Sequence, residues 1–224
     1  RQFGVHTLVQ LEHPGERPRE LRVLRAPYKA RDYAIEPDAS SATYFMAAAA
    51  ARPGASVTIP GLGQDSLQGD VGFGEVLEKM GAAMTRDDNS VTVEGAEKLR
   101  GIDVEMSDMP DAAMTLAALS VLAEGPTTIR GLHTLRVKET DRLSALQTEL
   151  LKLGAETAID GDTLRIDPPR EVRPAEIDTY DDHRMAMSFA VVGTRAPGIT
   201  IRNAECVSKT YPRFFEDLER LRPK

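Results

Sequence analysis

The chain repeats one pattern of strand and helix about every 70 residues, and this periodicity limits its possible folds more than any other feature. Three β-like stretches share a Thr-Ile step, at 56–62, 126–132 and 198–204. Each follows an alanine- or methionine-rich stretch that predicts a helix, at 40–51, 111–123 and 182–192. A period of about 70 residues is in the size range of a supersecondary repeat.

A second helix is predicted in each unit, ending at 77–82, 151–155 and 218–221. Gly81 and Gly154 are typical helix C-terminal stops. A hairpin pattern follows the first two, at 84–93 around Asp88-Asn89 and at 157–166 around Asp160-Gly161-Asp162. The unit is therefore β-α-β-α-β-β, and the fold class is mixed α and β.

The two ends of the chain do not complete this pattern. Residues 1–5 resemble the end of a second helix, and segments 6–10 and 20–25 flank Pro14-Gly15 like a hairpin. We interpret 1–37 as a hairpin and linker from another lobe. We interpret 38–224 as a lobe with two full repeats and one unfinished repeat. This division predicts a fragment of a longer protein. The alternative is a native terminus whose match to the repeat is coincidental.

Composition narrows the class of protein. A net charge of −7 argues against a general nucleic-acid binder, and no apolar run has the length of a membrane span. A single cysteine, Cys206, allows no internal disulfide, and no targeting peptide is visible, so a reducing, cytoplasmic location is expected. The four histidines have no metal-ligand spacing, so no metal site is predicted.

The most charged stretch precedes the most regular apolar stripe. Leucines at 143, 146, 150 and 153 predict one buried helix face. Charges crowd just before it, at Arg136, Lys138, Glu139, Asp141 and Arg142. Cations at a helix start make Lys138 and Arg142 candidate ligands for a phosphate or carboxylate. The alternative is a solvated first turn with local ion pairs.

Equivalent helix starts in a repeat array can face one side. That arrangement would gather a set of charged residues on one surface: Asp111, Lys138, Glu139, Arg142, Asp182, His183, Arg184 and Lys209. Such a surface would bind a multiply anionic ligand and offer acid–base groups. Three simpler interpretations stay open: the aspartates at 38, 111 and 182 as N-caps, Lys209 as a surface lysine, and His183 as a satisfied histidine.

Several motifs then carry a resemblance to a known family. Segments 37–42, 110–115, 136–143, 182–187 and 209–212 resemble the signature motifs of 5-enolpyruvylshikimate-3-phosphate synthases, in order along nearly the whole chain. The resemblance is to the C-terminal half of that enzyme. It implies an α-β prism, the enolpyruvyl transferase fold, with three repeats per lobe about a pseudo-threefold axis. This chain would hold one lobe plus a remnant of the other.

The resemblance implies an activity as well. The family transfers the enolpyruvyl (carboxyvinyl) group of phosphoenolpyruvate to the 5-hydroxyl of shikimate 3-phosphate and releases phosphate, without a cofactor. The reaction belongs to the shikimate pathway to chorismate and aromatic amino acids, and the enzyme is the glyphosate target.

The same resemblance implies roles for individual residues. Asp111 would be the general base on the shikimate 5-hydroxyl, and Glu139 would exchange the proton at the methylene of the enolpyruvyl group. Lys138 would contact shikimate 3-phosphate and assist proton transfer. The remaining positions would bind substrate or act in support: Thr134 for shikimate phosphate, Arg142, Arg184 and Lys209 for phosphoenolpyruvate, and His183 with Asp182 in secondary roles. The family often has Asn where this chain has Thr134, which puts that contact in doubt.

Three interpretations of function follow. In the first, the chain is an enolpyruvyl transferase fragment with little turnover alone, because the missing N-terminal half supplies other substrate ligands. In the second, it is a non-catalytic anion-binding lobe that needs that half as a partner. In the third, it is a UDP-N-acetylglucosamine enolpyruvyl transferase relative, although the Lys138-Glu139-Thr140-Asp141-Arg142 motif speaks against this interpretation.

Overall fold

The computed structural model describes residues 3–11 and 19–221. The chain divides into two compact units, residues 1–35 and 36–224. Each unit is described separately below.

The first unit is built on a two-stranded antiparallel pairing. Strand β1 (Thr7–Gln10) pairs with β2 (Glu20–Val23), with Thr7 opposite Val23. The ring of Phe3 packs against Tyr28 and Tyr33. The two strands of the predicted hairpin are confirmed. Its Pro14-Gly15 turn and the first two residues of the predicted helix end lie outside the described residues.

The second unit alternates helices and strands. Its α-helices are α1 (Ala39–Ala50), α2 (Phe73–Met80), α3 (Pro110–Leu119), α4 (Arg142–Lys152), α5 (His183–Gly193) and α6 (Phe214–Arg220). Its strands are β3 (Ser56–Pro60), β4 (Ala83–Arg86), β5 (Ser90–Glu94), β6 (Asp103–Glu105), β7 (Thr127–Arg130), β8 (Glu156–Asp160), β9 (Thr163–Asp167), β10 (Ala175–Ile177) and β11 (Ile199–Ile201). Short 3₁₀ segments lie between them: η1 (Gly69–Gly72), η2 (Ser120–Leu122), η3 (His133–Val137) and η4 (Ala204–Lys209).

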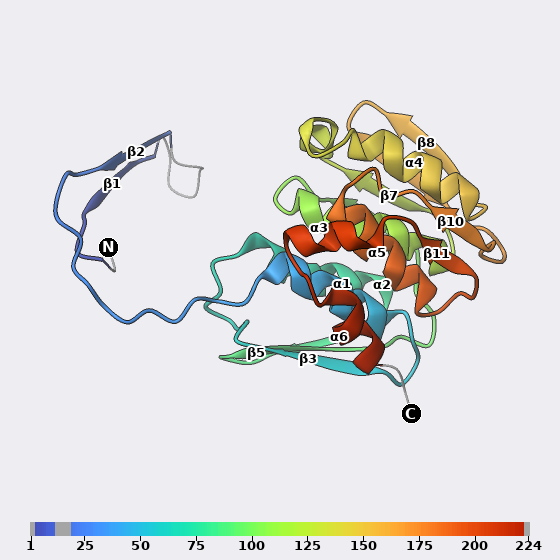
Figure 1. Ribbon diagram of the computed structural model, residues 1–224, viewed down its shortest axis with the longest axis horizontal. Helices are drawn as coiled ribbons and strands as arrows, with labels where there is room; N and C mark the ends of the chain where they lie inside the picture. Colours follow the sequence, from blue (N-terminus) through green and yellow to red (C-terminus); the bar gives the residue numbers. More distant parts are fainter. Residues whose placement is uncertain (1–2, 12–18, 222–224) are drawn as a thin grey trace. The chain divides into compact units, whose positions relative to one another are not determined.

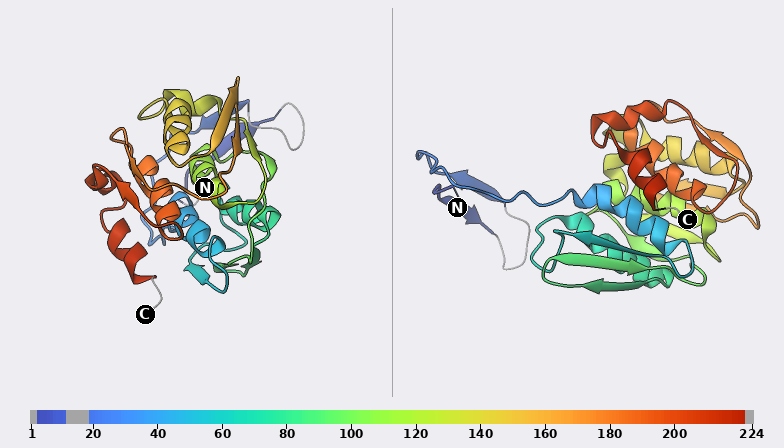
Figure 2. Two further views of the ribbon diagram at one scale, coloured as in Figure 1. Left: turned by 90° about the vertical axis from the view of Figure 1, so that its right-hand side faces the viewer. Right: turned by 60° about the horizontal axis from the view of Figure 1, so that its bottom comes forward.

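Three helices form the centre of this unit. Helices α1, α3 and α5 pack against one another. The sheets and the second helix of each sequence repeat surround them (Figures 1 and 2). They are apolar nearly all round, as expected for helices with neighbours on every side. Their many alanines, such as Ala47 and Ala117, let the helix axes approach closely. These are the helices predicted from the alanine- and methionine-rich stretches.

The strands follow the repeat. The four-stranded sheet has the order β6-β7-β9-β8. Strand β7 pairs in parallel with β6 and antiparallel with β9, which forms a hairpin with β8. A three-stranded sheet has the order β3-β5-β4, and β10 pairs in parallel with β11. Both predicted hairpins are confirmed. Gly81 (φ 110°) and Gly154 (φ 91°) end α2 and α4 in the left-handed region, as predicted.

The division of residues 38–224 into two full repeats and one unfinished repeat stays a prediction. Residues 24–38 form no β-structure, so α1 has no strand directly before it, whereas α3 and α5 do. The equivalent strands β6 and β10 are only three residues long, so each contributes few ladder hydrogen bonds. A strand so short is marginal without further packing.

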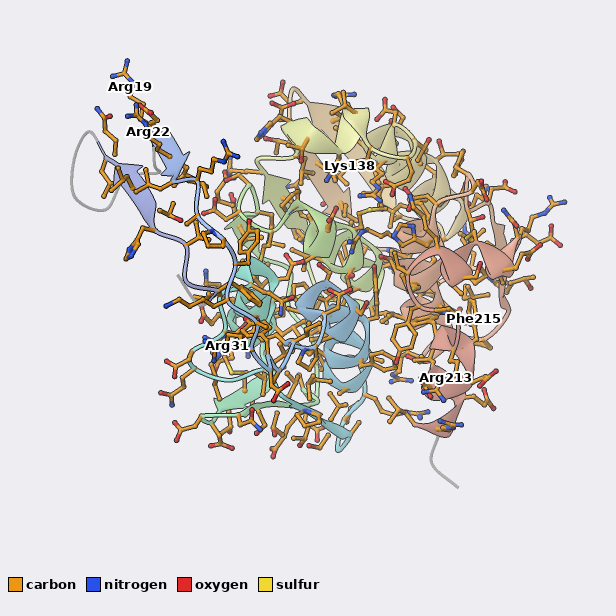
Figure 3. The ribbon with its side chains drawn as sticks, turned by 60° about the vertical axis from the view of Figure 1, so that its left-hand side comes forward. Arg19, Arg22, Arg31, Lys138, Arg213 and Phe215 are labelled. Carbon is orange, nitrogen blue, oxygen red and sulfur yellow. The ribbon has the colours of Figure 1, made fainter. Side chains whose placement is uncertain are left out.

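Two second helices begin later than predicted. Helix α2 begins at Phe73 rather than near 65–70, because the glycine-bearing segment η1 precedes it. Helix α6 begins at Phe214 rather than near 208–210, just after Arg213 (Figure 3). Pro212 has no N–H and disfavours helical backbone before it, so η4 stops at Lys209. The start of α4 and its buried leucine stripe are as predicted.

Within the described residues, no helix combines the length and the apolar character needed to cross a bilayer. The same residues contain no group of three or more His, Cys, Asp and Glu side chains placed to hold a metal ion.

Candidate active site

One buried guanidinium joins the starts of three helices. Arg142, the first residue of α4, is only 1% exposed, and three carboxylates surround it. Its Nε donates to Asp182 Oδ2 at 2.7 Å, Nη1 to Asp111 Oδ1 at 2.8 Å, and Nη2 to Glu139 Oε2 at 2.8 Å. These partners precede or begin α5, α3 and α4. The planar fork of arginine donors suits such a three-sided contact.

Three further cations border this centre. Arg184 Nη2 lies 3.1 Å from Asp111 Oδ2, Lys209 Nζ lies 2.7 Å from Glu139 Oε1, and Lys138 Nζ lies 3.6 Å from Asp111 Oδ1. Exposure rises from the buried arginine outward, to 33% for the Lys138 side chain and 56% for Lys209. Figure 3 labels Lys138 near the start of α4. The lysines therefore face solvent, from which an anionic ligand would arrive.

The capping interpretation holds for two of the three aspartates. Asp38 accepts from Ser40 N at 2.9 Å, and Asp182 accepts from Arg184 N at 2.8 Å, each at the N-cap of its helix. Asp111 is different, because Pro110 occupies the first position of α3 and Met109 is the N-cap, without a side-chain bond. The Asp111 carboxylate is thus free of a capping role and faces Lys138, Arg142 and Arg184.

Glu139, the carboxylate that pairs with the exposed Lys209, is strongly held in its charged form. Partial burial acts to raise the pKa of the Glu139 carboxyl. The hydrogen bond from Lys209 and the charge of Arg142 outweigh that effect and lower the pKa to about 2. Glu139 is therefore ionised at neutral pH.

His183 is buried beside the ion cluster without joining it. Its Nδ1 has no hydrogen-bond partner and lies 3.9 Å from Asp182 Oδ1. Burial lowers the pKa of His183, although the Asp182 charge acts in the opposite direction. The imidazole is consequently neutral at pH 7.

We expect His183 to titrate below the ordinary histidine pKa, which NMR of the ring carbons across pH 4–8 measures. Because the unfolded chain takes up this proton at higher pH than the folded chain, His183 stabilises the fold above about pH 6.5. That contribution is lost as pH falls from there toward the folded pKa. A His183 midpoint at or above the ordinary histidine value of about 6.5 would contradict the expectation.

Two residues at this centre were not predicted from the sequence. Tyr44 of α1 is buried, and its hydroxyl accepts a hydrogen bond from Arg184 Nη1 at 3.4 Å. Asp70 of η1 accepts a hydrogen bond from Ser40. Burial raises the pKa of Asp70, the Ser40 bond lowers it, and the Asp111 charge raises it further. An alanine-rich helix gives no polar signal for Tyr44, so only the packing reveals its contact.

Thr134 and Lys209 lie in 3₁₀ segments rather than in α-helices. Thr134 is in η3, and its buried Oγ1 has no hydrogen-bond partner among the described residues. Lys209 ends η4 and reaches Glu139 across 70 residues of sequence. Cys206, in the same segment, has its thiol pKa raised by burial, so the structure does not make it a reactive thiolate.

The arrangement suits an anionic substrate and proton transfer. Four cations (Lys138, Arg142, Arg184, Lys209) meet three carboxylates (Asp111, Glu139, Asp182) within one connected network. The three carboxylates pair with the four cations, which leaves the network with one excess positive charge. A ligand with phosphate and carboxylate groups would take over some of those contacts and free the acidic groups for acid–base work.

Comparison with known proteins gives a consistent result. A family model described as EPSP synthase (3-phosphoshikimate 1-carboxyvinyltransferase) matches residues 15–218. The 3-phosphoshikimate 1-carboxyvinyltransferase of Serratia proteamaculans is 46% identical over 221 residues, which are 99% of this chain and 50% of that protein. The chloroplastic 3-phosphoshikimate 1-carboxyvinyltransferase of Solanum lycopersicum is 52% identical over 193 residues, which are 83% of this chain and 37% of that protein.

Solved structures agree with the sequence relatives. EPSP synthase from Acinetobacter baumannii superposes with a TM-score of 0.82 at 27% identity, covering 98% of this chain and 52% of that one. The enolpyruvyl transferase NikO from Streptomyces tendae superposes with a TM-score of 0.72 at 27% identity, covering 98% and 50%. The chain spans about half the length of the curated Serratia relative and of these solved structures.

Proposed function

The chain belongs to the EPSP synthase family and has the enolpyruvyl transferase fold, and on this premise we propose that it supplies one lobe of a carboxyvinyl-transfer site. The complete site would join phosphoenolpyruvate to the 5-hydroxyl of shikimate 3-phosphate and release phosphate. The observation that carries the proposal is the convergence of four cations on Asp111 and Glu139 at the starts of α3 and α4.

Phosphoenolpyruvate would bind to the cations around Asp111 and Glu139. Arg184 and Lys209 would hold its phosphate and carboxylate, with Arg142 behind them and Lys138 directed to shikimate 3-phosphate. Arginine offers paired N–H donors for such oxygens. The buried, unpartnered hydroxyl of Thr134 has a free donor for a phosphate oxygen, which supports a minor contact there.

In the first chemical step, the shikimate 5-oxygen would bond to C2 of phosphoenolpyruvate while C3 gains a proton. Asp111 would accept the hydroxyl proton, because its carboxylate has no capping role and faces the cations. In the second step, C3 would lose a proton and the bond between C2 and the phosphate oxygen would break. This restores the carbon–carbon double bond and releases phosphate.

Glu139 would exchange the proton at C3. In the structure it is ionised, with a pKa lowered to about 2 by Lys209 and Arg142 against the effect of burial. A ligand phosphate that draws Lys209 away would remove one of these contacts and raise the Glu139 pKa. Substrate binding would thereby prepare Glu139 to carry a proton. His183 and Asp182 would support the site without touching substrate.

A polypeptide that spans the other half of the family's length would be the partner of this chain. A cytoplasmic location is also part of the proposal.

We expect this chain alone to show little or no phosphate release from the two substrates, because it spans about half the length of its relatives and would supply only part of the substrate contacts. Mixing it with a polypeptide that spans the other half should restore turnover, measured as phosphate released over time. Ordinary turnover by this chain alone would contradict the expectation.

Calorimetric titration with phosphoenolpyruvate tests the site directly. We expect Lys209→Met to weaken binding about tenfold or more, since one charge-assisted contact is lost. Lys98→Met is the matched control, because Lys98 forms an exposed ion pair with Glu124 elsewhere on the lobe. Equal affinities for the two variants would refute a role of Lys209 in binding. If the unmodified chain binds no phosphoenolpyruvate but the mixed halves do, the anion site needs both halves.

A further inference from the structure

A strained turn lies directly before one of the carboxylates of the site. Tyr180 (φ 55°) and Asp181 (φ 56°) are left-handed, and Asp182 follows them. Among the described residues, only Asn203 is another non-glycine with positive φ, and its amide donates to Asp181 Oδ1 at 3.1 Å. Residues with a side chain rarely adopt this backbone conformation, so surrounding contacts must hold the turn.

A buried glutamate of α4 supplies such contacts. Glu149 is fully buried, and its Oε1 accepts from the Tyr180 hydroxyl at 2.7 Å. Its Oε2 accepts from Asp178 N at 3.1 Å and pairs with Lys152 Nζ at 2.7 Å. Lys152 Nζ also reaches Asp178 Oδ2 at 2.7 Å, so the buried charge has a cation and two hydrogen-bond donors.

The same helix holds the turn at both ends. Glu149 follows Arg142 by two helical turns, which places both side chains on one face of α4. Helix α4 itself lies beside β10 (Figure 1). Arg142 binds Asp182 at the end of the turn, and Glu149 binds its beginning. Asp182 in turn caps α5 by accepting from Arg184 N. The position of Arg184 over Asp111 therefore depends on this turn.

We propose that Glu149 is a positioning residue, which fixes the 178–182 turn so that Asp182 and Arg184 meet Arg142 and Asp111. It acts through the turn and touches no substrate. The consequence for substrate binding rests on the proposed function, whereas the effect on the turn does not.

The test is Glu149→Gln, read by amide hydrogen exchange. Glutamine keeps the shape but removes the negative charge that pairs with Lys152, and its nitrogen cannot accept the hydrogen bond that Tyr180 or Asp178 N donates to Glu149. We expect exchange of the 180–184 amides and of the Arg142 Nε–H to quicken about ten- to a hundredfold. Ile166→Val is the control, a core change of modest cost in β9, whose strand partners are β7 and β8. It should leave those sites at the wild-type rate relative to the rest of the lobe.

A second variant separates strain from general damage. Adding Tyr180→Gly to Glu149→Gln should return exchange at 182–184 toward the wild-type rate, because glycine adopts the left-handed conformation without strain. Tyr180→Phe alone removes one bond and should give a smaller local effect if Glu149→Gln does not fold. Uniform acceleration across the lobe, or no change at the turn, overturns the proposal.

Phosphoenolpyruvate titration of the same variants distinguishes the two proposals. Weaker binding by Glu149→Gln together with local exchange supports the role in the site. Unchanged affinity despite faster local exchange overturns that role. If wild-type protein, alone and with the other half, binds no phosphoenolpyruvate, the proposed function fails, while local exchange in Glu149→Gln still supports control of the turn.

Discussion

Replacing Arg142 with leucine is expected to destabilise the lobe formed by residues 36–224 by about 3–5 kcal/mol, because three carboxylates would lose their common cation. Arg142 is 1% exposed, and Asp182 is fully buried beside it. Removing one member of a buried charge network costs far more than the network contributes, since unpaired charges remain in a low-dielectric site. Urea unfolding followed by circular dichroism measures the loss.

The matched control is Arg130→Leu. Arg130 also forms a two-bonded pair with a carboxylate, Asp103, but both side chains are about half exposed. Water screens a surface pair of this kind, so Arg130→Leu should change the free energy of unfolding far less than Arg142→Leu does. Adding Asp182→Asn to Arg142→Leu should recover part of the stability by removing a stranded charge. Equal losses at Arg142 and Arg130 would show that burial of the network is not what makes it sensitive.

Replacing Asp111 with asparagine is expected to lower the turnover of the mixed halves by about 10²–10⁴-fold, the usual range for loss of a general base. Binding of phosphoenolpyruvate should not weaken, because one negative charge beside Arg184 and Lys138 disappears. Steady-state phosphate release and calorimetric titration, measured on the same preparation, give this split between turnover and affinity.

Asp103→Asn is the control for Asp111→Asn. Asp103 is an exposed carboxylate on β6, paired with Arg130, and its loss should leave turnover within twofold of wild type. If Asp111→Asn keeps most of its turnover, another group accepts the hydroxyl proton. If it loses affinity and turnover together, Asp111 serves to organise the cations rather than to move a proton.

The repeat could be predicted from the sequence because its signals are local. Alanine-rich stretches, leucine spacing, terminal glycines and turn residues each act within a few residues, and the helices and hairpins formed where these signals lie. The exceptions also have local causes. Pro212 delays α6, and glycines delay α2.

The roles of Asp38, Asp111 and Asp182 could be predicted only in part from the sequence. All three lie near helix starts, where capping is the simplest interpretation. Pro110 was the signal that sets Asp111 apart, because proline prefers the first helical position and makes the residue before it the cap. Asp38 and Asp182 do cap their helices. Asp182, however, also binds Arg142, a contact that no local pattern indicates.

By itself, the sequence determined the repeat unit, the helices of each repeat and the charged residues at the starts of those helices. Periodicity and capping are properties of neighbouring residues, so the sequence carries them directly. The tertiary structure alone decided that Arg142 is buried among three carboxylates, that Tyr44 meets Arg184, and that Glu149 holds a left-handed turn. Apart from the contact between Arg142 and Glu139, these contacts join residues about 30 to 140 positions apart. Their strength comes from exclusion of water, which depends on the packed core.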